Sequence, residues 1–357
     1  MLIYWLVWGG VSLLALLDNK KLFFKCLYFL TLFFLTIFVG LRYEIGVDWD
    51  TYLIFYDTLK WYSFEDAIFY TDPIFGALNY WGNKLGFKDT LFVNLSCSIF
   101  LFYFFYKFSK KFHYKYVPLL VSYTYFIVVV SMNYVRQSVA VSISLLAMYY
   151  ALQGKKYNFI FLIILASLFH KSAIVLLVFF PLCFLSKVEL SRFIIFIYVA
   201  VSIIFITVVL YLSGLQGGNI YTDSDSEISS SGTLFRLGSH LIPLVLYLKN
   251  RYRFKCFLNS NIVILDYLVV LILYCVFLSF FYSTLADRFN LYLFFFDVYI
   301  YSFLCDKMNL KNRISLLLVI FIFSSFNFFV WFNFGTYATK GWIPYQNYII
   351  NFLSSSF

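Results

Sequence analysis

Charged residues are scarce in this chain. Of its 357 residues, 12% are Asp, Glu, Lys or Arg, whereas 63% are hydrophobic and 24% are aromatic. A soluble domain carries roughly 25% charged and 45–50% apolar residues. Because so little polar surface is available to face water, the composition excludes an ordinary soluble globular protein and predicts a membrane domain.

The motifs of nucleotide, hydrolase and metal chemistry are missing as well. The sequence holds no Walker A motif, no Gly-x-Gly-x-x-Gly and no Gly-x-Ser-x-Gly. It has three histidines, of which His113 falls in a basic linker, so no histidine-rich metal site is expected. The six cysteines show no Cys-x-x-Cys spacing, which is typical of apolar filler. We therefore expect neither a metal nor a cofactor.

Long apolar runs fill most of the sequence. A helix needs about 20 predominantly apolar residues to cross a bilayer, and the chain offers about twelve (11–14) such runs. None of them alternates as a barrel strand does. We expect an all-α, polytopic integral membrane protein in which residues 1–357 form a single transmembrane domain. The expected spans are residues 2–17, 22–41, 90–106, 116–132, 134–152, 157–170, 172–186, 193–213, 235–248, 262–283, 288–304 and 314–332.

Three segments are expected outside these spans. Outer loops are predicted at about 42–89 and 214–234, and a short re-entrant or amphipathic segment at about 342–353. The first apolar run lacks a basic n-region and a small-residue cleavage site, so we expect a retained span rather than a signal peptide.

Lysine and arginine predict the orientation. They cluster in linkers that fall on one side of the twelve-span arrangement, and the positive-inside rule places that side in the cytoplasm and both termini outside. The net charge of +10 is then mainly topological and gives no case for nucleic-acid binding. Most acidic residues fall on the other side, so we expect the active face to be extracytoplasmic. The cations that remain outside are Arg42, Lys60, Lys84, Lys88, Arg136, Lys171, Arg236, Arg288 and Lys340.

Several outer cations stand at the expected mouths of spans, where a charge is costly unless it is paired or lines a wet cavity. With two histidines, this set is Arg136, His170, Lys171, Arg236, His240 and Arg288. Arg236 and His240 share one helix face at spacing i, i+4. Arginine offers bidentate donors to phosphate and lysine a point charge, so the set suits a phosphate-bearing substrate. A His–Lys pair at a helix turn is also typical of a simple polar cap.

Carboxylates alternate with aromatic rings in the stretch GLRYEIGVDWDTYLIFY at 40–56. Aromatic faces pack on the C–H faces of sugars and carboxylates accept hydroxyl hydrogens, so the stretch suits sugar binding. An Asp-x-Asp pair also suits a divalent metal with a nucleotide sugar, but such sugars are cytosolic and this loop is expected outside. A solvated acidic loop is the remaining alternative.

Three stretches, in order along nearly the whole chain, carry a family resemblance. They are FVGLRYEIGVDWDTY, then NYVRQSVAVSISLLAMYYALQGKKYNFIFLIILASLFHKSAIV, then WIPYQNY. Together they resemble the EpsG family of bacterial polysaccharide-assembly proteins, which is grouped with the Wzy-type O-antigen and capsule polymerases. The most specific signal is Arg-Gln-x-x-Ala followed by His-Lys-Ser-Ala, and the resemblance is strongest over residues 41–52 and 133–175.

The resemblance implies a glycosyltransferase of the bacterial plasma membrane that acts on undecaprenyl-diphosphate-linked oligosaccharides. Such polymerases transfer a growing glycan from one lipid diphosphate to a sugar hydroxyl of another lipid-linked repeat unit. No metal is expected, so stabilising the charge of the leaving diphosphate should be the largest contribution to catalysis. Membrane lipids, a flippase and a chain-length regulator are the implied partners.

Site roles follow from this mechanism. The acceptor hydroxyl needs a base, for which both His170 and Asp48 are candidates, and Arg42 is expected to hold a second lipid diphosphate or to pair with Glu44. The candidates for catalytic or diphosphate-binding cations are Arg136, Lys171, Arg236, His240 and Arg288. The candidates for a sugar groove are Trp49, Asp50, Tyr52, Trp342 and Tyr345.

Other functions remain open. A ligase would move finished glycan onto a different acceptor, and a polyprenyl-phosphate-sugar glycosyltransferase would make more use of the acidic first loop. A lipid-linked sugar flippase or transporter should show polar groups near the bilayer midplane. Most ionisable groups instead cluster at one face, which favours the enzyme. Asp297 is the exception, and it suits either a proton relay or a pair with an internal donor.

Overall fold

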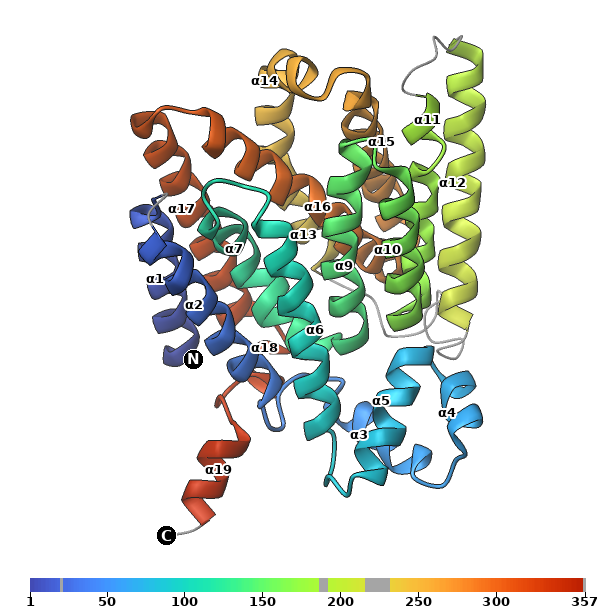
Figure 1. The fold of residues 1–357 in the computed structure, drawn as a ribbon, viewed down its shortest axis with the longest axis vertical. Helices are drawn as coiled ribbons and strands as arrows, with labels where there is room; N and C mark the ends of the chain where they lie inside the picture. Colours follow the sequence, from blue (N-terminus) through green and yellow to red (C-terminus); the bar gives the residue numbers. More distant parts are fainter. Residues whose placement is uncertain (20–21, 186–191, 216–231, 356–357) are drawn as a thin grey trace. The chain divides into compact units, whose positions relative to one another are not determined.

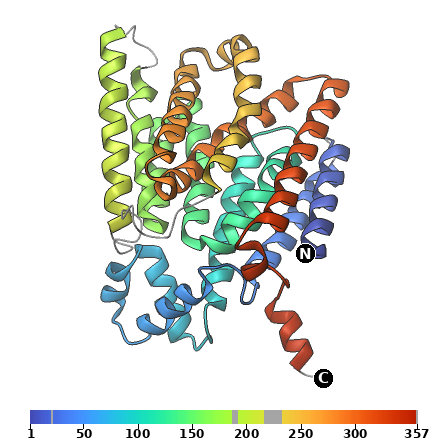
Figure 2. The same cartoon turned by 180° about the vertical axis from the view of Figure 1, so that it is seen from behind.

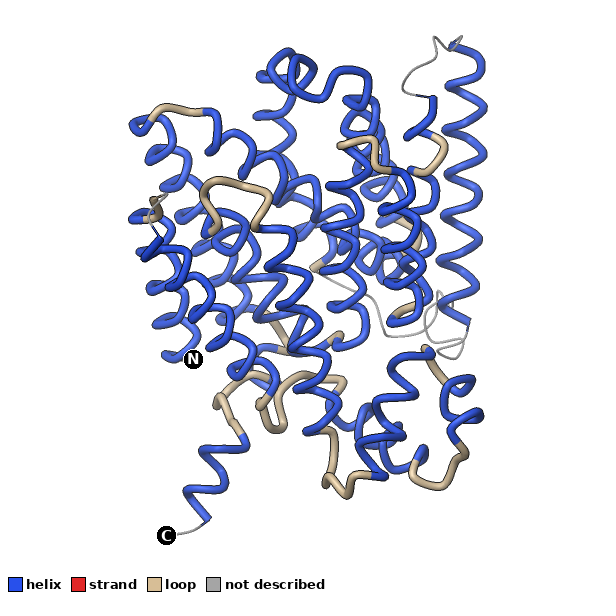
Figure 3. The backbone as a smooth tube through the Cα atoms, in the orientation of Figure 1, coloured by secondary structure: helices blue, strands red, loops and turns tan. Residues whose placement is uncertain are grey.

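The computed structural model describes residues 1–19, 22–185, 192–215 and 232–355. Within these ranges the chain is helical and forms no β-strand, and an isolated bridge joins Arg42 to Asn347 (Figure 3). The predicted all-α fold is therefore confirmed for the described residues. The outer loop expected at 214–234 lies almost entirely outside them.

Helices form at each predicted apolar run, and three further helices lie within the outer loop that was predicted at about 42–89 (Figure 1). In chain order they are α1 (Leu2–Leu17), α2 (Leu22–Gly40), α3 (Trp49–Leu59), α4 (Phe64–Tyr70), α5 (Pro73–Lys84), α6 (Leu91–Ser109), α7 (Tyr116–Ser122), η1 (Tyr123–Val130), α8 (Ser131–Asn133), α9 (Val135–Leu152), α10 (Lys156–Phe169), η2 (Lys171–Phe179), α11 (Leu182–Leu185), α12 (Arg192–Leu215), α13 (Thr233–Leu237), η4 (Gly238–His240), α14 (Leu241–Leu258), η5 (Asn259–Asn261), α15 (Ile262–Ser279), α16 (Ser283–Lys307), α17 (Leu310–Phe334), α18 (Ala338–Gly341) and α19 (Tyr348–Ser355).

Seven stretches of the described residues are long and apolar enough to cross a membrane, and three shorter apolar helices accompany them. One of the seven, Thr233–Ser279, contains both α14 and α15. These features establish a polytopic membrane protein. The count of about twelve spans and the assignment of sides remain predictions.

The chain divides into two compact units. Unit 1 comprises Met1–Ser142 and Tyr301–Phe357, and unit 2 comprises Ile143–Ile300. In unit 1 the continuous run α7–η1–α8 is the buried centre, and helices α1, α6 and α17 pack against it (Figures 1 and 2). In unit 2, η2 packs against α10 and α12, and α15 packs against α11, α13 and α14.

The central run of unit 1 contains an eight-residue π-helix, η1. A π-helix shifts the backbone ladder and leaves carbonyl groups that need other donors. A distant side chain supplies one: the indole Nε1 of Trp342 donates to the Val128 carbonyl of η1 at 3.0 Å. Directly after η1, Nε of Arg42 donates to the Met132 carbonyl of α8 at 3.0 Å. The irregular helix is therefore stabilised by residues from both ends of unit 1.

The first outer segment is helical rather than an open loop. Ser63 caps α4 by accepting the Asp66 N–H at 3.1 Å, and Pro73 begins α5, a position where its missing N–H is not needed. A Cβ on Gly76 would lie 2.1 Å from the Ala67 carbonyl oxygen, so glycine lets α4 and α5 approach closely. These local signals explain why α4 and α5 form within the stretch that was predicted as an outer loop.

The C-terminal segment binds back to the start of this outer segment. Backbone N–H groups of Tyr43, Gly46 and Tyr348 donate to the carbonyls of Gln346, Gly341 and Leu41 at 3.1, 2.8 and 2.9 Å, respectively. Within the segment expected at 342–353, Trp342 is 2% exposed, whereas Ile349 and Ile350 on α19 are about half exposed. This segment is therefore part of the packing of unit 1.

Two carboxylates, those of Asp18 and Asp306, fix the turn before α7 at the N-terminal end of the central run. Asp306 accepts hydrogen bonds from the backbone N–H groups of His113 and Tyr114, at 2.9 and 3.2 Å, and Asp18 accepts one from Tyr116 at 3.1 Å. Asp18 is 4% exposed, and burial raises the pKa of its carboxyl to about 6. The hydrogen bond and the charge of Arg313 oppose that shift without cancelling it.

Candidate functional site

The predicted site residues fall in both units, and each unit is described by itself. In unit 1 they lie where three separate parts of the chain meet, at residues 41–48, 132–136 and 341–348. These parts contain the stretches that carry the family resemblance in this unit. The fold therefore brings together motifs that are far apart in the sequence.

Asp48 lies half-buried at the N-terminal end of α3. Its backbone N–H donates to Oδ1 of Asn133 at 3.0 Å, and Nδ2 of Asn133 donates to Oδ2 of Asp48 at 3.4 Å. Asn133 ends α8, directly before the break that precedes α9. One asparagine side chain thus holds both the backbone and the carboxylate of Asp48.

Arg136 occupies the first turn of α9, three residues after Asn133 and beyond the break at Tyr134. Its Nη1 donates to Oγ1 of Thr71 at 2.7 Å and to Oδ2 of Asp72 at 2.8 Å, and the guanidinium lies over the rings of Phe55 and Phe75. Among the described residues, none accepts a hydrogen bond from its Nε–Nη2 edge. The outer helices therefore fix one side of this cation and leave an edge suited to a bidentate anion.

Arg42 is held inside the protein. It is 1% exposed and donates to the carbonyls of Met132 and Val39 and to Oδ1 of Asn94, at 3.0, 2.9 and 3.2 Å. Burial lowers the pKa of Arg42 to about 10, so the guanidinium stays charged at neutral pH. These bonds hold the Arg42 side chain within the packing of unit 1. Its binding of a lipid diphosphate remains a prediction.

The predicted sugar-groove aromatics are mostly packed. Trp49 and Tyr52 are each 7% exposed and Trp342 is 2% exposed. The Tyr345 hydroxyl donates to the Phe38 carbonyl at 2.8 Å, and its ring stacks on the Phe38 ring with centroids 4.6 Å apart. Of the five candidates, Asp50 is exposed. The aromatic rings therefore pack within unit 1, whereas the exposed side chain of Asp50 is accessible to a ligand.

In unit 2, His170 and Lys171 lie at the junction between α10 and η2. His170 ends α10 with an extended backbone and is half-buried, whereas the Lys171 side chain is exposed. The neighbouring Ser172 hydroxyl is 2.8 Å from the hydroxyl of Tyr292 on α16. Tyr292 follows the half-buried Arg288 by four residues, so the contact joins the His-Lys junction to the helix that carries Arg288.

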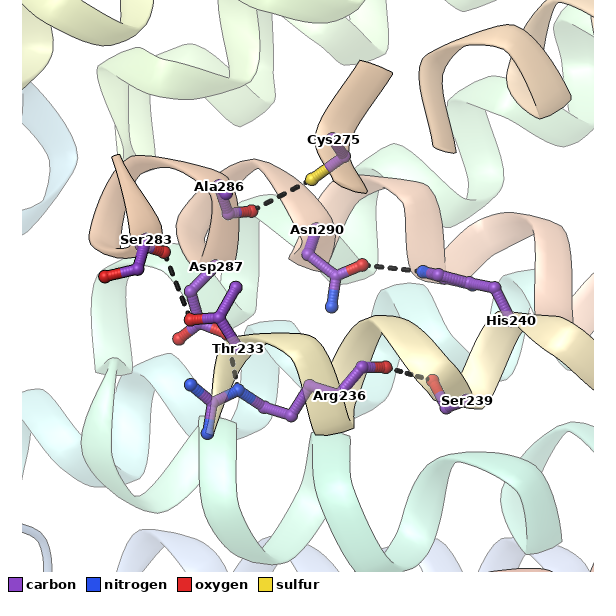
Figure 4. Close-up of polar contacts among 9 residues, drawn as sticks. All are labelled: Thr233, Arg236, Ser239, His240, Cys275, Ser283, Ala286, Asp287 and Asn290. Carbon is purple, nitrogen blue, oxygen red and sulfur yellow. Dashed lines mark hydrogen bonds and ion pairs between the residues drawn. The ribbon is translucent and has the colours of Figure 1, made fainter. Parts of the chain in front are cut away.

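The side chain of Arg236 is neutralised within unit 2. Its Nε donates to Oδ1 of Asp287 at 2.5 Å, and the Thr233 hydroxyl on the same short helix donates to the Ser283 carbonyl at 3.1 Å (Figure 4). The side chain of Arg236 is 24% exposed and that of Asp287 is 10% exposed. The pair therefore attaches α13 to α16.

His240 is buried one turn further along the same seam. Its Nδ1 lies 2.7 Å from Oδ1 of Asp297 and its Nε2 lies 2.6 Å from Oδ1 of Asn290 (Figure 4 shows the second contact). His240 is 2% exposed and Asp297 is 3% exposed. Of the two alternatives for Asp297, the structure provides the pair with an internal donor.

Several polar residues of these clusters were not among the predicted site residues, namely Asn133, Thr71, Asp72, Asp287 and Asn290. One signal was available in the sequence. Asp287, Asn290 and Asp297 follow one another at i, i+3 and i+10, which puts them on one helix face. Arg236 and His240 lie on one face of another helix at spacing i, i+4, so the two polar faces could have been predicted to pair. Asn133 gave no comparable signal, because its role depends on a helix break.

In the ranges that the structure describes, no group of three or more His, Cys, Asp or Glu side chains is placed to hold a metal ion. The acidic residues Asp223, Asp225 and Glu227 lie outside those ranges.

Comparison with known proteins identifies the family. The model of the EpsG family matches residues 25–347, which include every predicted site residue of both units. No curated protein and no solved structure matches the chain. Membership of this family indicates a role like that of a polysaccharide polymerase, carried out by a multi-pass membrane protein. Since the match covers most of the sequence, the chain belongs to the EpsG family.

Proposed function

We propose that this protein polymerises a polysaccharide on the outer face of the bacterial plasma membrane. It transfers a growing glycan from undecaprenyl diphosphate to a sugar hydroxyl of another lipid-linked repeat unit. The observation that carries the proposal is the contact between Asp48, which precedes α3, and Asn133, which lies three residues before Arg136 of α9. A carboxylate suited to act as a base is thus bound to the segment that carries a cation suited to phosphate.

The proposed chemistry is a glycosyl transfer without a nucleotide sugar. The acceptor hydroxyl attacks the anomeric carbon of the donor, and the bond from that carbon to the diphosphate oxygen breaks. Asp48 accepts the hydroxyl proton, with His170 as the alternative base. The diphosphate leaves with the bonding electron pair, and the Nε–Nη2 edge of Arg136 stabilises its charge.

The four cationic candidates of unit 2 fall into two groups with different proposed roles. Arg236 and His240 are matched by Asp287 and Asp297, so we assign them to holding α13 and η4 against α16. Lys171, which is exposed, and Arg288, which is half-buried, are assigned to binding a lipid diphosphate. The reaction uses two such diphosphates, one on the donor and one on the acceptor.

Sugar contacts and partners complete the proposal. Asp50 is exposed beside Asp48 and suits a sugar hydroxyl, whereas Trp49, Tyr52, Trp342 and Tyr345 shape the surrounding packing. A flippase that delivers the lipid-linked units and a chain-length regulator are proposed partners. Both would act at the same membrane.

The decisive experiment incubates purified protein with a matched lipid-linked repeat unit and separates the products on a gel. A ladder is expected from the wild type, and single units from Asp48→Asn and Arg136→Ala. Because Arg and Lys are proposed to neutralise the diphosphates, the ladder should persist in excess EDTA. Loss of the ladder in EDTA with recovery in Mg²⁺ would replace this mechanism by a metal-dependent one.

A second candidate function is transport of a lipid-linked glycan across the membrane. It is favoured by the buried His240–Asp297 pair, because ionisable pairs inside helical bundles often mark transport or proton pathways. A vesicle assay with fluorescent lipid-linked glycan would test it. Transport lost in Asp297→Asn, together with no ladder from the wild type, would favour the transporter.

A further inference from the structure

Asn133 is placed to control the geometry of Asp48. It is 6% exposed, and its amide oxygen and amide nitrogen both contact Asp48. A buried amide needs hydrogen-bond partners, because leaving its polar atoms unsatisfied costs their full desolvation penalty. Asp48 supplies two of them. We propose that Asn133 is a positioning residue that orients the Asp48 carboxylate for the transfer, an inference that rests on the proposed function.

The backbone around Asn133 presents this side chain. Asn133 ends α8, and Tyr134 adopts φ −90° and ψ 66° before α9 begins. Tyr134 N–H donates to the Val130 carbonyl and Ser138 N–H donates to the Tyr134 carbonyl, both at 2.8 Å, so one helical ladder ends and the next begins at Tyr134. Asn133 is therefore the last residue of a hydrogen-bonded helix, joined directly to the next helix through Tyr134.

The outer loop can reach Asn133 because residue 46 is glycine. Gly46 has φ +102°, and a Cβ there would lie 2.4 Å from the Met132 carbonyl oxygen and 3.2 Å from Oδ1 of Asn133. Any other side chain would push the loop away from the helix. Arg42, on the other side of the same loop, donates to the Met132 carbonyl. Gly46 and Arg42 thus fix the residue that precedes Asn133.

This arrangement restricts how the carboxylate of Asp48 can turn. The bond from Nδ2 of Asn133 fixes Oδ2, and the bond from the Asp48 backbone N–H fixes the residue's own main chain. A base whose orientation is set in advance does not lose conformational entropy when substrate binds. Removing the amide should therefore slow the chemical step more than it weakens substrate binding.

The test uses the isosteric exchange of the two side chains. Asn133→Asp, Asn133→Ala, Asp48→Asn and the double exchange Asp48→Asn/Asn133→Asp are compared by kcat, KM, pH–rate profile and Tm. The matched control is Asn79→Ala, which removes a buried asparagine whose amide donates to a carbonyl of its own helix, that of Phe75 at 2.7 Å. If Asn133→Ala does not accumulate, Asn133→Asp carries the test.

The expected results separate positioning from simple stability. Asn133→Ala should lose about 10²-fold in kcat with KM within about twofold, because a misplaced base loses much of the 10²–10⁴-fold that general-base catalysis typically contributes. Asn133→Asp should shift the acid limb of the pH–rate profile to higher pH, because a second carboxylate disfavours the charged form of Asp48. The double exchange should recover Tm but not activity, since position 48 then carries an amide.

Four outcomes would overturn the inference or its basis, and they are distinguishable. Wild-type kcat in Asn133→Ala, or an unmoved acid limb in Asn133→Asp, would defeat the positioning role. A double exchange no more stable than either single variant would mean that the pair itself does not form. A wild type that makes no ladder would defeat the proposed function, and the Tm comparison would still report on the pair.

Discussion

The guanidinium of Arg136 and the carboxylate of Asp72 form an ion pair with Nη1 and Oδ2 2.8 Å apart. The side chain of Asp72 is 5% exposed and that of Arg136 is 24% exposed, so Asp72 is the more deeply buried partner. Asp72 also precedes α5, and the pair therefore joins the outer helices to α9. A cation that is oriented in this way can meet an anion with its other edge at little further entropic cost.

Arg136→Lys should reduce polymerisation by at least about tenfold although the charge is kept. Lysine cannot contact Thr71 and Asp72 while presenting a second pair of donors, because an ammonium is a point charge. The measurement is the ladder assay with matched protein amounts. The control is Arg251→Lys at the more exposed pair with Asp266, where little change is expected. Equal activity of Arg136→Lys and wild type would remove the bidentate role.

His170→Ala should abolish the ladder while expression and membrane insertion stay intact. The residue is half-buried at a helix junction, so the change removes little packing, whereas loss of a general base costs 10²–10⁴-fold in rate. Lys171→Arg should keep partial activity, because a point charge tolerates another cation. Normal polymerisation by His170→Ala would return this pair to a polar cap and leave Asp48 as the base.

His240→Ala should destabilise the protein by about 3–5 kcal/mol, because it leaves the Asp297 carboxylate buried without its partner. The same applies to Asp297→Ala, and the double variant should cost less than the sum of the two. Thermal unfolding in detergent gives the comparison. His113→Ala is the control, since this side chain is exposed and the change should stay within about 0.5 kcal/mol. Additive effects in the double variant would speak against the pair.

Acidification should stabilise unit 1 through Asp18. The folded-state pKa of this carboxyl, about 6, lies above its ordinary value of 3.8. Its contribution to stability is therefore complete below pH 3.8 and is lost as the pH rises through 6. When the pH falls from 7 to 5, the Tm of the wild type should rise relative to that of Asp18→Asn. The free energy of unfolding of the wild type should increase by an amount on the order of 1–3 kcal/mol relative to the variant. Parallel Tm curves for the two proteins would contradict this.

Cysteine labelling should establish the sides of the membrane. After replacement of the exposed Cys26 and Cys256, a membrane-impermeant maleimide added from outside should label Lys60→Cys and Lys88→Cys. Lys111→Cys and Arg253→Cys should stay protected until the membrane is opened, because basic linkers remain in the cytoplasm. The reverse pattern would invert the orientation and place the proposed site on the wrong face.

The helices were predictable because the bilayer imposes length and apolarity on each span. Every apolar run of the sequence forms one helix or up to three consecutive helical elements in the described residues. The short helices α3, α4 and α5 were not predicted, although Ser63 and Pro73 are ordinary helix-start signals. Charged residues are frequent in this stretch, and they gave it the pattern of a loop.

The partners of the charged residues were less predictable. Arg42 donates to a carbonyl of α8, between the π-helix η1 and the break at Tyr134, and no periodicity in the sequence announces either irregularity. Trp342 resembled a sugar-binding aromatic for the same reason, since its indole donor satisfies another carbonyl of this run. Interactions that depend on backbone irregularity require the fold itself.

Unit 1 is built from the first and the last parts of the chain, which has a consequence for its synthesis. The ribosome delivers residues 1–142 well before Gly341, Trp342 and Gln346. Before these residues are made, the bond from Gly46 to Gly341 and the donor to Val128 are missing. The surroundings of Asp48 are therefore completed only after residue 346 has been made, and a chain that stops after α17 contains Asp48 and Arg136 but lacks the segment that binds back to residues 41–46.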